Sequence, residues 1–160
     1  MDIYKPTIDV SKKKKIHSKY VVGSVLDADK HFKPKSFDSV VALDLIEHLT
    51  KKEGLILIKK MENIACKNII IMTPNGFTNQ NAYDKNPYQV HKSGWTAGEF
   101  KKLGFTVRGM RGLKSLRGDY ASLKYQPWIL WGIIATVSEY LLYFFPQYSY
   151  HLFAVKNIQE

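Results

Sequence analysis

The side chains best suited to proton transfer lie directly after one apolar run of the sequence. Asp44, Glu47 and His48 follow residues 37–43, and His91 lies in a polar loop further along the chain. A histidine beside carboxylates can accept a proton from a hydroxyl or an amine. If a helix begins where the apolar run ends, Asp44 and His48 stand at positions i and i+4 on one face. We therefore predict that these four residues surround a reacting group. The alternative, that the carboxylate and the two histidines only order the loop, stays open.

Alternating strand and helix signals predict the elements that position these side chains. Apolar or β-branched runs predict five strands, at residues 20–25, 37–43, 68–73, 105–109 and 150–155. Helices are expected at residues 7–19, at residues 51–65 after the capping-box spacing of Thr50 and Glu53, and from Thr96. This alternation is typical of an α/β fold with a Rossmann-like, doubly wound and mostly parallel sheet. Ligands bind such sheets outside the carboxyl ends of the strands, where Trp95 is a candidate wall of the site.

Residues 128–145 form an apolar segment in which Glu139 is the one charged residue. The length lies at the lower edge of what a transmembrane helix needs. The central glutamate, the proline at position 146 and the strand signal that follows favour a buried or amphipathic crossover helix instead. A helix that lies on a membrane surface or faces a hydrophobic substrate is the second interpretation, because aromatic rings suit interfaces. A membrane span is the third.

The composition describes a basic protein, with 24 Lys and Arg against 14 Asp and Glu and a net charge of +10. Such an excess can attract nucleic acid, anionic lipid or an acidic substrate. No nucleic-acid-binding motif accompanies the charge, so we do not expect a nucleic-acid partner, whereas peripheral membrane contact stays open. The single cysteine, Cys66, excludes an intramolecular disulfide and a multi-thiolate metal site. The N-terminus has no signal-peptide pattern, and we expect a cytoplasmic location.

Several segments together resemble class I S-adenosylmethionine-dependent methyltransferases of the type 11 kind. The similar segments are Asp2-Ile3-Tyr4, Gly23-Ser24-Val25-Leu26-Asp27, residues 36–49, residues 69–76 and Leu103-Gly104-Phe105. The most specific part is residues 36–49, a Ser-Phe-Asp strand entry followed by a Leu-Asp-x-x-Glu-His exit. Residues 44–49 look most like the branch that methylates small molecules. The chain is then expected to be one domain, with a cofactor-side core at 1–112, an apolar crossover segment at 113–149 and a terminal strand at 150–155.

The resemblance also implies which residues contact the cofactor, S-adenosylmethionine. The expected contacts are Asp2, Ile3, Ser24, Val25, Asp27 and Leu43. Asp2 matches the acidic residue that accepts hydrogen bonds from both ribose hydroxyls in the family. Ser24 stands where the family commonly has an aspartate that meets the adenine amino group, and Asp27 or the backbone of Val25 would replace that contact. The backbone of Leu43 is expected beside the methionine part. No metal ligand is carried over.

The family's first strand and glycine-rich loop have no counterpart in this sequence. They would precede Asp2, and no GxGxG-like pattern occurs elsewhere. We therefore expect an N-terminally truncated methyltransferase fold. The missing segment would come from a partner chain, or the remaining strands or a homodimer would close the gap.

The expected function is methyl transfer from S-adenosylmethionine to an O, N or C atom of a small-molecule acceptor. The alternative is a degenerate or split module that keeps the fold without independent activity. Such a module would bind or regulate, and it would contact nucleic acid or an anionic membrane surface.

Overall fold

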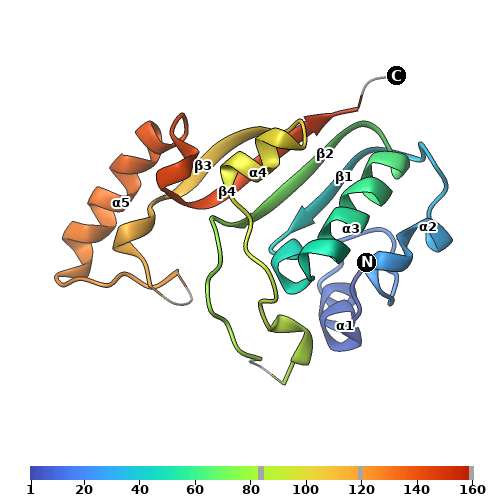
Figure 1. Cartoon of the computed structure of the whole chain (residues 1–160). Helices are drawn as coiled ribbons and strands as arrows, with labels where there is room; N and C mark the ends of the chain where they lie inside the picture. Colours follow the sequence, from blue (N-terminus) through green and yellow to red (C-terminus); the bar gives the residue numbers. More distant parts are fainter. Residues whose placement is uncertain (83–84, 119–120, 159–160) are drawn as a thin grey trace.

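Four strands form one open sheet in the computed structural model, which describes residues 1–82, 85–118 and 121–158 (Figure 1). The strands are β1 (Phe37–Leu43), β2 (Ala65–Pro74), β3 (Thr106–Leu113) and β4 (Ser149–Asn157). Their order is β1-β2-β4-β3. The α/β class and four of the five predicted strands are confirmed. The β1–β2 pair is parallel, but β4 runs antiparallel to both of its neighbours, so the sheet is mixed rather than mostly parallel.

The helices are α1 (Lys5–Lys13), α2 (Ala28–His31), α3 (Lys51–Ile64), α4 (Ala97–Lys102) and α5 (Trp128–Leu142). Both α3 and α4 begin with a capping box. At the start of α3, the Thr50 hydroxyl accepts a hydrogen bond from the Glu53 amide, and the Glu53 carboxylate accepts one from the Thr50 amide. These bonds satisfy backbone donors that a helix start leaves unpaired. The capping-box prediction at Thr50 is therefore confirmed.

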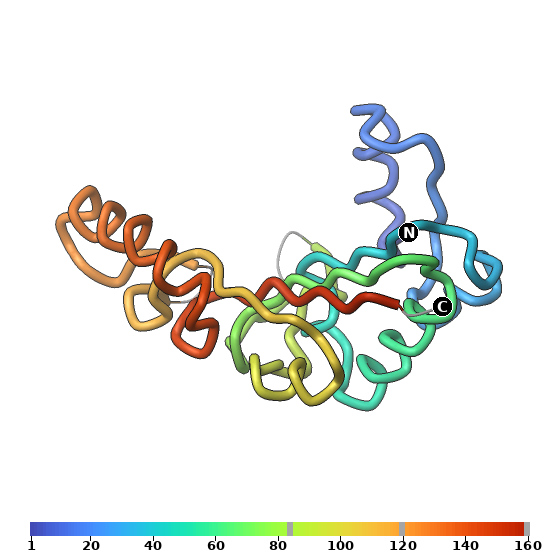
Figure 2. Tube along the Cα trace, turned by 90° about the horizontal axis from the view of Figure 1, so that it is seen from above, coloured from blue at the N-terminus to red at the C-terminus, as the bar shows by residue number. Residues whose placement is uncertain are grey.

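The core lies between one face of the sheet and helices α3 and α4, which are on the same side of it (Figure 2). Alternate residues of β2, Ile69 and Ile71, are fully buried against this layer. On β1, Val41 and Leu43 remain exposed. In the described part of the chain α3 and α4 therefore cover one face of the sheet, and the N-terminal helical segment lies on its other side (Figure 2).

The predicted strand at residues 20–25 is wrong. The segment makes one isolated parallel bridge, between Asp2 and Val22. The Ser24 hydroxyl then accepts a hydrogen bond from the Leu26 amide and starts the 3-10 turn η1 (Val25–Asp27). This early turn leaves too short an extended run for a strand. Among the described residues, β1 pairs only with β2, so the N-terminal segment does not close the sheet by pairing with β1.

Helix α5 lies at the end of the molecule opposite the N-terminus (Figures 1 and 2). Its buried residues are Ala135 and Leu142, and most of its other side chains are exposed or half-exposed. Helix α5 packs along β3, the edge strand of the sheet, so of the expected buried or amphipathic helix the fully buried form is not present in the described residues. No helix in the described residues is both long enough and apolar enough to cross a membrane.

Candidate active site

The chain leaves the carboxyl end of β1 through a sharp turn at Asp44. The Asp44 amide donates to the Met72 carbonyl at 2.9 Å, which continues the β1–β2 pairing by one residue. Asp44 has a positive φ of 45°, in the left-handed region that Asp tolerates better than most residues. The 3-10 turn η2 (Ile46–His48) follows and is anchored by the fully buried Ile46. Asp44 lies outside this turn, so the predicted i, i+4 helical pair with His48 is wrong.

The Glu47 carboxylate is buried, with 3% of the residue exposed. Its Oε2 accepts a hydrogen bond from the Thr73 hydroxyl at 2.8 Å. Burial raises the pKa of Glu47 to about 7, because desolvation penalises the charged form more than the hydrogen bonds stabilise it. The backbone carbonyl of Glu47 accepts the amides of Lys92 and Ser93. Glu47 therefore orders the loop through its backbone and keeps a carboxyl group that titrates near neutral pH.

The two histidines are held by the same kind of hydrogen bond. His48 Nδ1 lies 3.2 Å from the Val90 carbonyl, and His91 Nδ1 lies 2.7 Å from the Thr78 carbonyl. A carbonyl can only accept, so each bond places the ring proton on Nδ1 and leaves a lone pair on Nε2. Burial lowers the pKa of His48, which favours the neutral ring. The ring centroids are 4.9 Å apart. Both residues thus order the loop and also present a basic nitrogen.

A fifth polar residue, His151 on β4, completes the group. Its Nε2 lies 3.1 Å from the Asp44 carboxylate, and its Nδ1 is buried with no hydrogen-bond partner among the described residues. Burial alone would raise the pKa of Asp44, but the hydrogen bond and charge of His151, together with the nearby Arg111, hold that pKa below its usual value. Sequence reasoning missed His151 because only the β2–β4 register, which pairs it with Pro74, brings it to the site.

Two cavities meet at this group. The first, here called the Asp2 cavity, is lined by Asp2, Ile3, Ser24, Val25, Leu43, Asp44 and His48 among others. The second, the His91 cavity, is lined by Asp44, Glu47, His48, His91 and His151 together with Thr78, Gln80 and Arg111. Asp44, His48 and Gln89 line both cavities, and Asp44 and His48 are the titratable residues of this shared wall.

Two residues singled out in the sequence lie outside both sets of lining residues. Asp27 makes an ion pair with Lys30 at 2.6 Å on the surface. Trp95 is buried in the core, where its ring stacks on Phe100 and its Nε1 donates to the Ser93 hydroxyl. The expectation that Trp95 forms a wall of the site is therefore wrong, since a large apolar ring beside α4 gains more from core burial.

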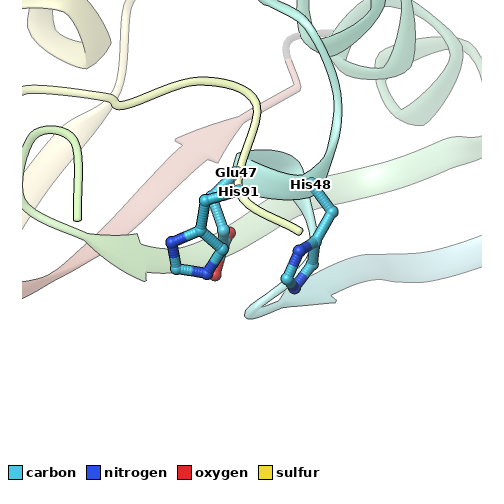
Figure 3. A group of neighbouring side chains, drawn as sticks. All are labelled: Glu47, His48 and His91. Carbon is cyan, nitrogen blue, oxygen red and sulfur yellow. The ribbon is translucent and has the colours of Figure 1, made fainter. Parts of the chain in front are cut away.

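Glu47, His48 and His91 also form a group that could hold a metal ion (Figure 3). Each offers one ligand atom, and these atoms lie within 4.8 Å of one another. Two imidazoles and a carboxylate suit divalent transition metals such as Zn²⁺ or Mn²⁺. Metal-binding histidines typically donate their other ring N–H to a carbonyl or carboxylate, as both of these rings do. The sequence predicted that the three residues lie around one reacting group, but their spacing did not indicate a metal site.

Three solved structures have folds similar to this chain, and two of them are methyltransferases. A SAM-dependent methyltransferase from Archaeoglobus fulgidus aligns with a TM-score of 0.51 at 16% identity, over 94% of this chain and 73% of that one. The PH0226 protein from Pyrococcus horikoshii OT3 aligns with a TM-score of 0.54 at 14% identity, over 98% and 69%. The small RNA methyltransferase HEN1 aligns with a TM-score of 0.55 at 18% identity, over 99% of this chain and 20% of HEN1.

This chain has a methyltransferase fold. The likeness rests on structure, because no family model and no curated protein matches the sequence. At this level of identity the comparison establishes the arrangement of the elements. The reaction of a chain with this fold depends on its own site residues.

Proposed function

We propose that this protein transfers a methyl group from S-adenosylmethionine to a small-molecule acceptor. The observation that carries the proposal is the wall of Asp44 and His48 shared by two cavities. A transfer between two bound molecules needs two adjoining sites that hold the reacting atoms in contact. The methyltransferase fold and the similarity of residues 44–49 to the small-molecule branch support the same function.

The residues of the Asp2 cavity fit the cofactor. Within the described ranges the Asp2 carboxylate accepts one backbone amide, from Tyr4 at 2.8 Å, and two carboxylate oxygens keep further acceptor capacity for ribose hydroxyls. Ile3 and Leu43 are exposed large apolar side chains beside it, which suit an adenosyl group. When bound, the cofactor supplies a methyl group on a positively charged sulfur. The Ser24 hydroxyl caps η1 and is therefore already engaged.

The residues of the His91 cavity hold the acceptor and remove its proton. His48 is the proposed proton acceptor, because its Nε2 carries a lone pair and the residue lines both cavities. The acceptor's O–H or N–H proton goes to Nε2 as the acceptor atom becomes nucleophilic. His91 and Glu47 position the acceptor by hydrogen bonds, and Asp44, kept charged by His151, faces the same space.

Calorimetric titration with S-adenosylhomocysteine, the product form of the cofactor, tests this proposal. We expect saturable binding by the wild type, a weakening of about tenfold or more in Asp2→Ala from loss of a charge-assisted hydrogen bond, and little change in Asp38→Ala. Asp38 is a matched control because it is an exposed carboxylate at the start of β1, paired with Lys67. Absence of binding to folded protein, or equal loss in both variants, would contradict the proposal.

The paired imidazole geometry favours a second candidate role for the same group, namely holding a divalent cation that polarises the acceptor. Titration with Mn²⁺ and with Zn²⁺ decides between the two roles. Saturable binding that is lost in His91→Ala and kept in His17→Ala supports the cation. If binding is absent, or unchanged in His91→Ala, proton acceptance by His48 stands alone. His17 serves as the control because it lies on the exposed segment after α1.

A further inference from the structure

The outward face of α5 is apolar along its whole length. Successive residues of a helix are 100° apart, which places one set of exposed side chains on the face opposite the buried Ala135 and Leu142. That set, here called the α5 face, consists of Ile129, Leu130, Ile133, Val137, Tyr140 and Leu141. Ile129 is 81% exposed and Tyr140 is 79% exposed. A surface helix of a water-soluble domain normally carries charged or polar residues there, so this pattern is inverted.

The attachment of α5 to the sheet fixes this face outward. A Cβ atom at Gly112 on β3 would clash with the Ala135 carbonyl oxygen, so the helix backbone packs directly on the strand. The Leu113 amide donates to the Ser138 hydroxyl at 3.3 Å. Glu139, the one charged residue of the helix, is half-buried and lies away from the α5 face. Turning the apolar residues inward would require breaking these contacts.

Exposed aromatic rings lie at both ends of the helix. Trp128 is 63% exposed at the first turn, on the side of the helix that carries Ala135, and Phe144 and Phe145 are exposed directly after the last turn and extend the α5 face. The patch therefore continues over about five turns of chain and exceeds the scattered single apolar side chains that soluble surfaces carry. Trp and Tyr rings, with an apolar body and a polar edge, are enriched where water meets lipid.

The elements next to α5 are basic. Arg108 on β3 lies over the rings of Tyr143 and Phe144, at 5.0 and 5.8 Å from their centroids. Further cations lie on the rest of β3, on the 3-10 turn η4 (Lys114–Leu116) and on the segment that leads into α5, namely Arg111, Lys114, Arg117 and Lys124. In residues 105–118 and 121–158 Glu139 is the one acidic residue, and the sequence adds Asp119 between these ranges. Basic residues thus outnumber acidic ones beside the apolar patch.

We propose that the α5 face docks on the surface of an anionic lipid bilayer, with the helix lying in the plane of the interface. A helix with no charge on its outward face, aromatic rings at its ends and cations beside it combines the two attractions that peripheral membrane binding uses. Burial of the apolar side chains between lipid headgroups supplies one, and attraction of the cations to anionic lipid supplies the other.

Vesicle flotation of the full 160-residue chain tests the docking. The probes are vesicles of phosphatidylcholine alone and of an equal mixture of phosphatidylcholine and phosphatidylglycerol. The test variant is Ile133→Glu with Val137→Glu, and the control is Leu55→Glu with Ile56→Glu on α3. Each variant replaces two exposed apolar residues, and each lowers the net charge by two.

We expect the wild type to float with the mixed vesicles and less with the neutral ones. The affinity of the α5 variant for the mixed vesicles should be lower by about 100-fold or more, because two apolar side chains are no longer buried in the lipid interface. The α3 variant should bind like the wild type, and both variants should retain their circular dichroism. No flotation of the folded wild type, or undiminished flotation of the α5 variant, would overturn the proposal. If the wild type is a dimer in solution and does not bind vesicles, and the α5 variant is a monomer, the proposal is overturned and the face belongs to a contact with a second copy.

Discussion

Helices α3 and α5 are similar in length and rich in apolar residues, yet they serve opposite purposes. Helix α3 buries Leu57, Ile58, Met61 and Ile64 against the sheet. Its capping box at Thr50 fixes the start of the helix two residues after His48. Helix α5 buries Ala135 and Leu142 and turns its larger apolar side chains outward. The apolar side chains of α3 stabilise the fold because they are buried within the chain. Most of the apolar surface of α5 stays exposed and would gain from burial against a second surface. Apolar content alone therefore does not tell which helices form a core.

The largest expected difference between the two helices concerns core packing. Met61→Ala in α3 should lower the free energy of unfolding by about 2 to 5 kcal/mol, because the residue is 2% exposed and its loss leaves a cavity. Chemical denaturation monitored by circular dichroism measures the change. Leu55→Ala, on the exposed side of the same helix, is the control and should change it far less. Equal losses in both variants would mean that α3 does not pack as described.

The site region beside α3 should also show a pH dependence. The folded pKa of Glu47, about 7, lies above its ordinary value of 4.5, so the folded chain binds this proton more tightly than the unfolded chain. The contribution of Glu47 to the free energy of unfolding is therefore largest below pH 4.5 and falls as pH rises to about 7, by about 3 kcal/mol in total.

Glu47→Gln keeps a side chain of the same shape that can still accept from Thr73, but it removes the titration. The difference in unfolding free energy between variant and wild type, measured from pH 4.5 to 7 without added metal, should grow in the variant's favour. A difference that stays constant with pH would contradict the burial of an ionisable group at Glu47.

A smaller effect should separate the helix starts. Thr50→Ala removes the hydroxyl of the α3 capping box and should cost about 1 kcal/mol of unfolding free energy. Helix α5 follows Pro127 and has no side-chain cap. Thr136→Ala within α5 is the matched control, because the Thr136 hydroxyl donates to the Gly132 carbonyl of its own helix and caps no helix start. Thermal melts of the two variants should differ in midpoint, with Thr50→Ala the lower.

The smallest effect on stability is expected on the α5 face. Val137→Ala should change the free energy of unfolding by no more than about 0.5 kcal/mol, because the side chain is 61% exposed and has little to lose. Denaturation without lipid measures this directly. A loss comparable with that of Met61→Ala would show that α5 packs against the chain in solution, and the comparison between the helices would fail.

The sequence predicted α3 and the strands around the site because their patterns are locally decisive. Residues 68–73 can only be a buried strand, and Thr50 with Glu53 fixes the helix start. The antiparallel place of β4 could not be predicted in this way, since periodicity does not carry strand direction. Burial and exposure of α5 both stayed open in the sequence for a related reason. A segment that is apolar on all sides does not indicate which face will be covered.

Most of the residues that the sequence predicts for the site line the two cavities, but their geometry could not be predicted. Asp44, Glu47, His48 and His91 do line one cavity, and five of the six expected cofactor contacts line the next one. Asp27 does not, because Lys30 three residues later pairs with it on the surface. His151 is brought in by the β2–β4 pairing and contacts Asp44, which is 107 residues away in sequence, so no local pattern reveals it.

The shared wall between the two cavities is the central claim, and histidine ring resonances test it most directly. The nitrogen and carbon-bound proton signals of His48 and His17 would be followed by NMR as S-adenosylhomocysteine is added. The account predicts a saturable shift at His48, which lines the Asp2 cavity, and none at the remote His17. Binding that leaves the His48 signals unmoved, or that moves His17 equally, would contradict it.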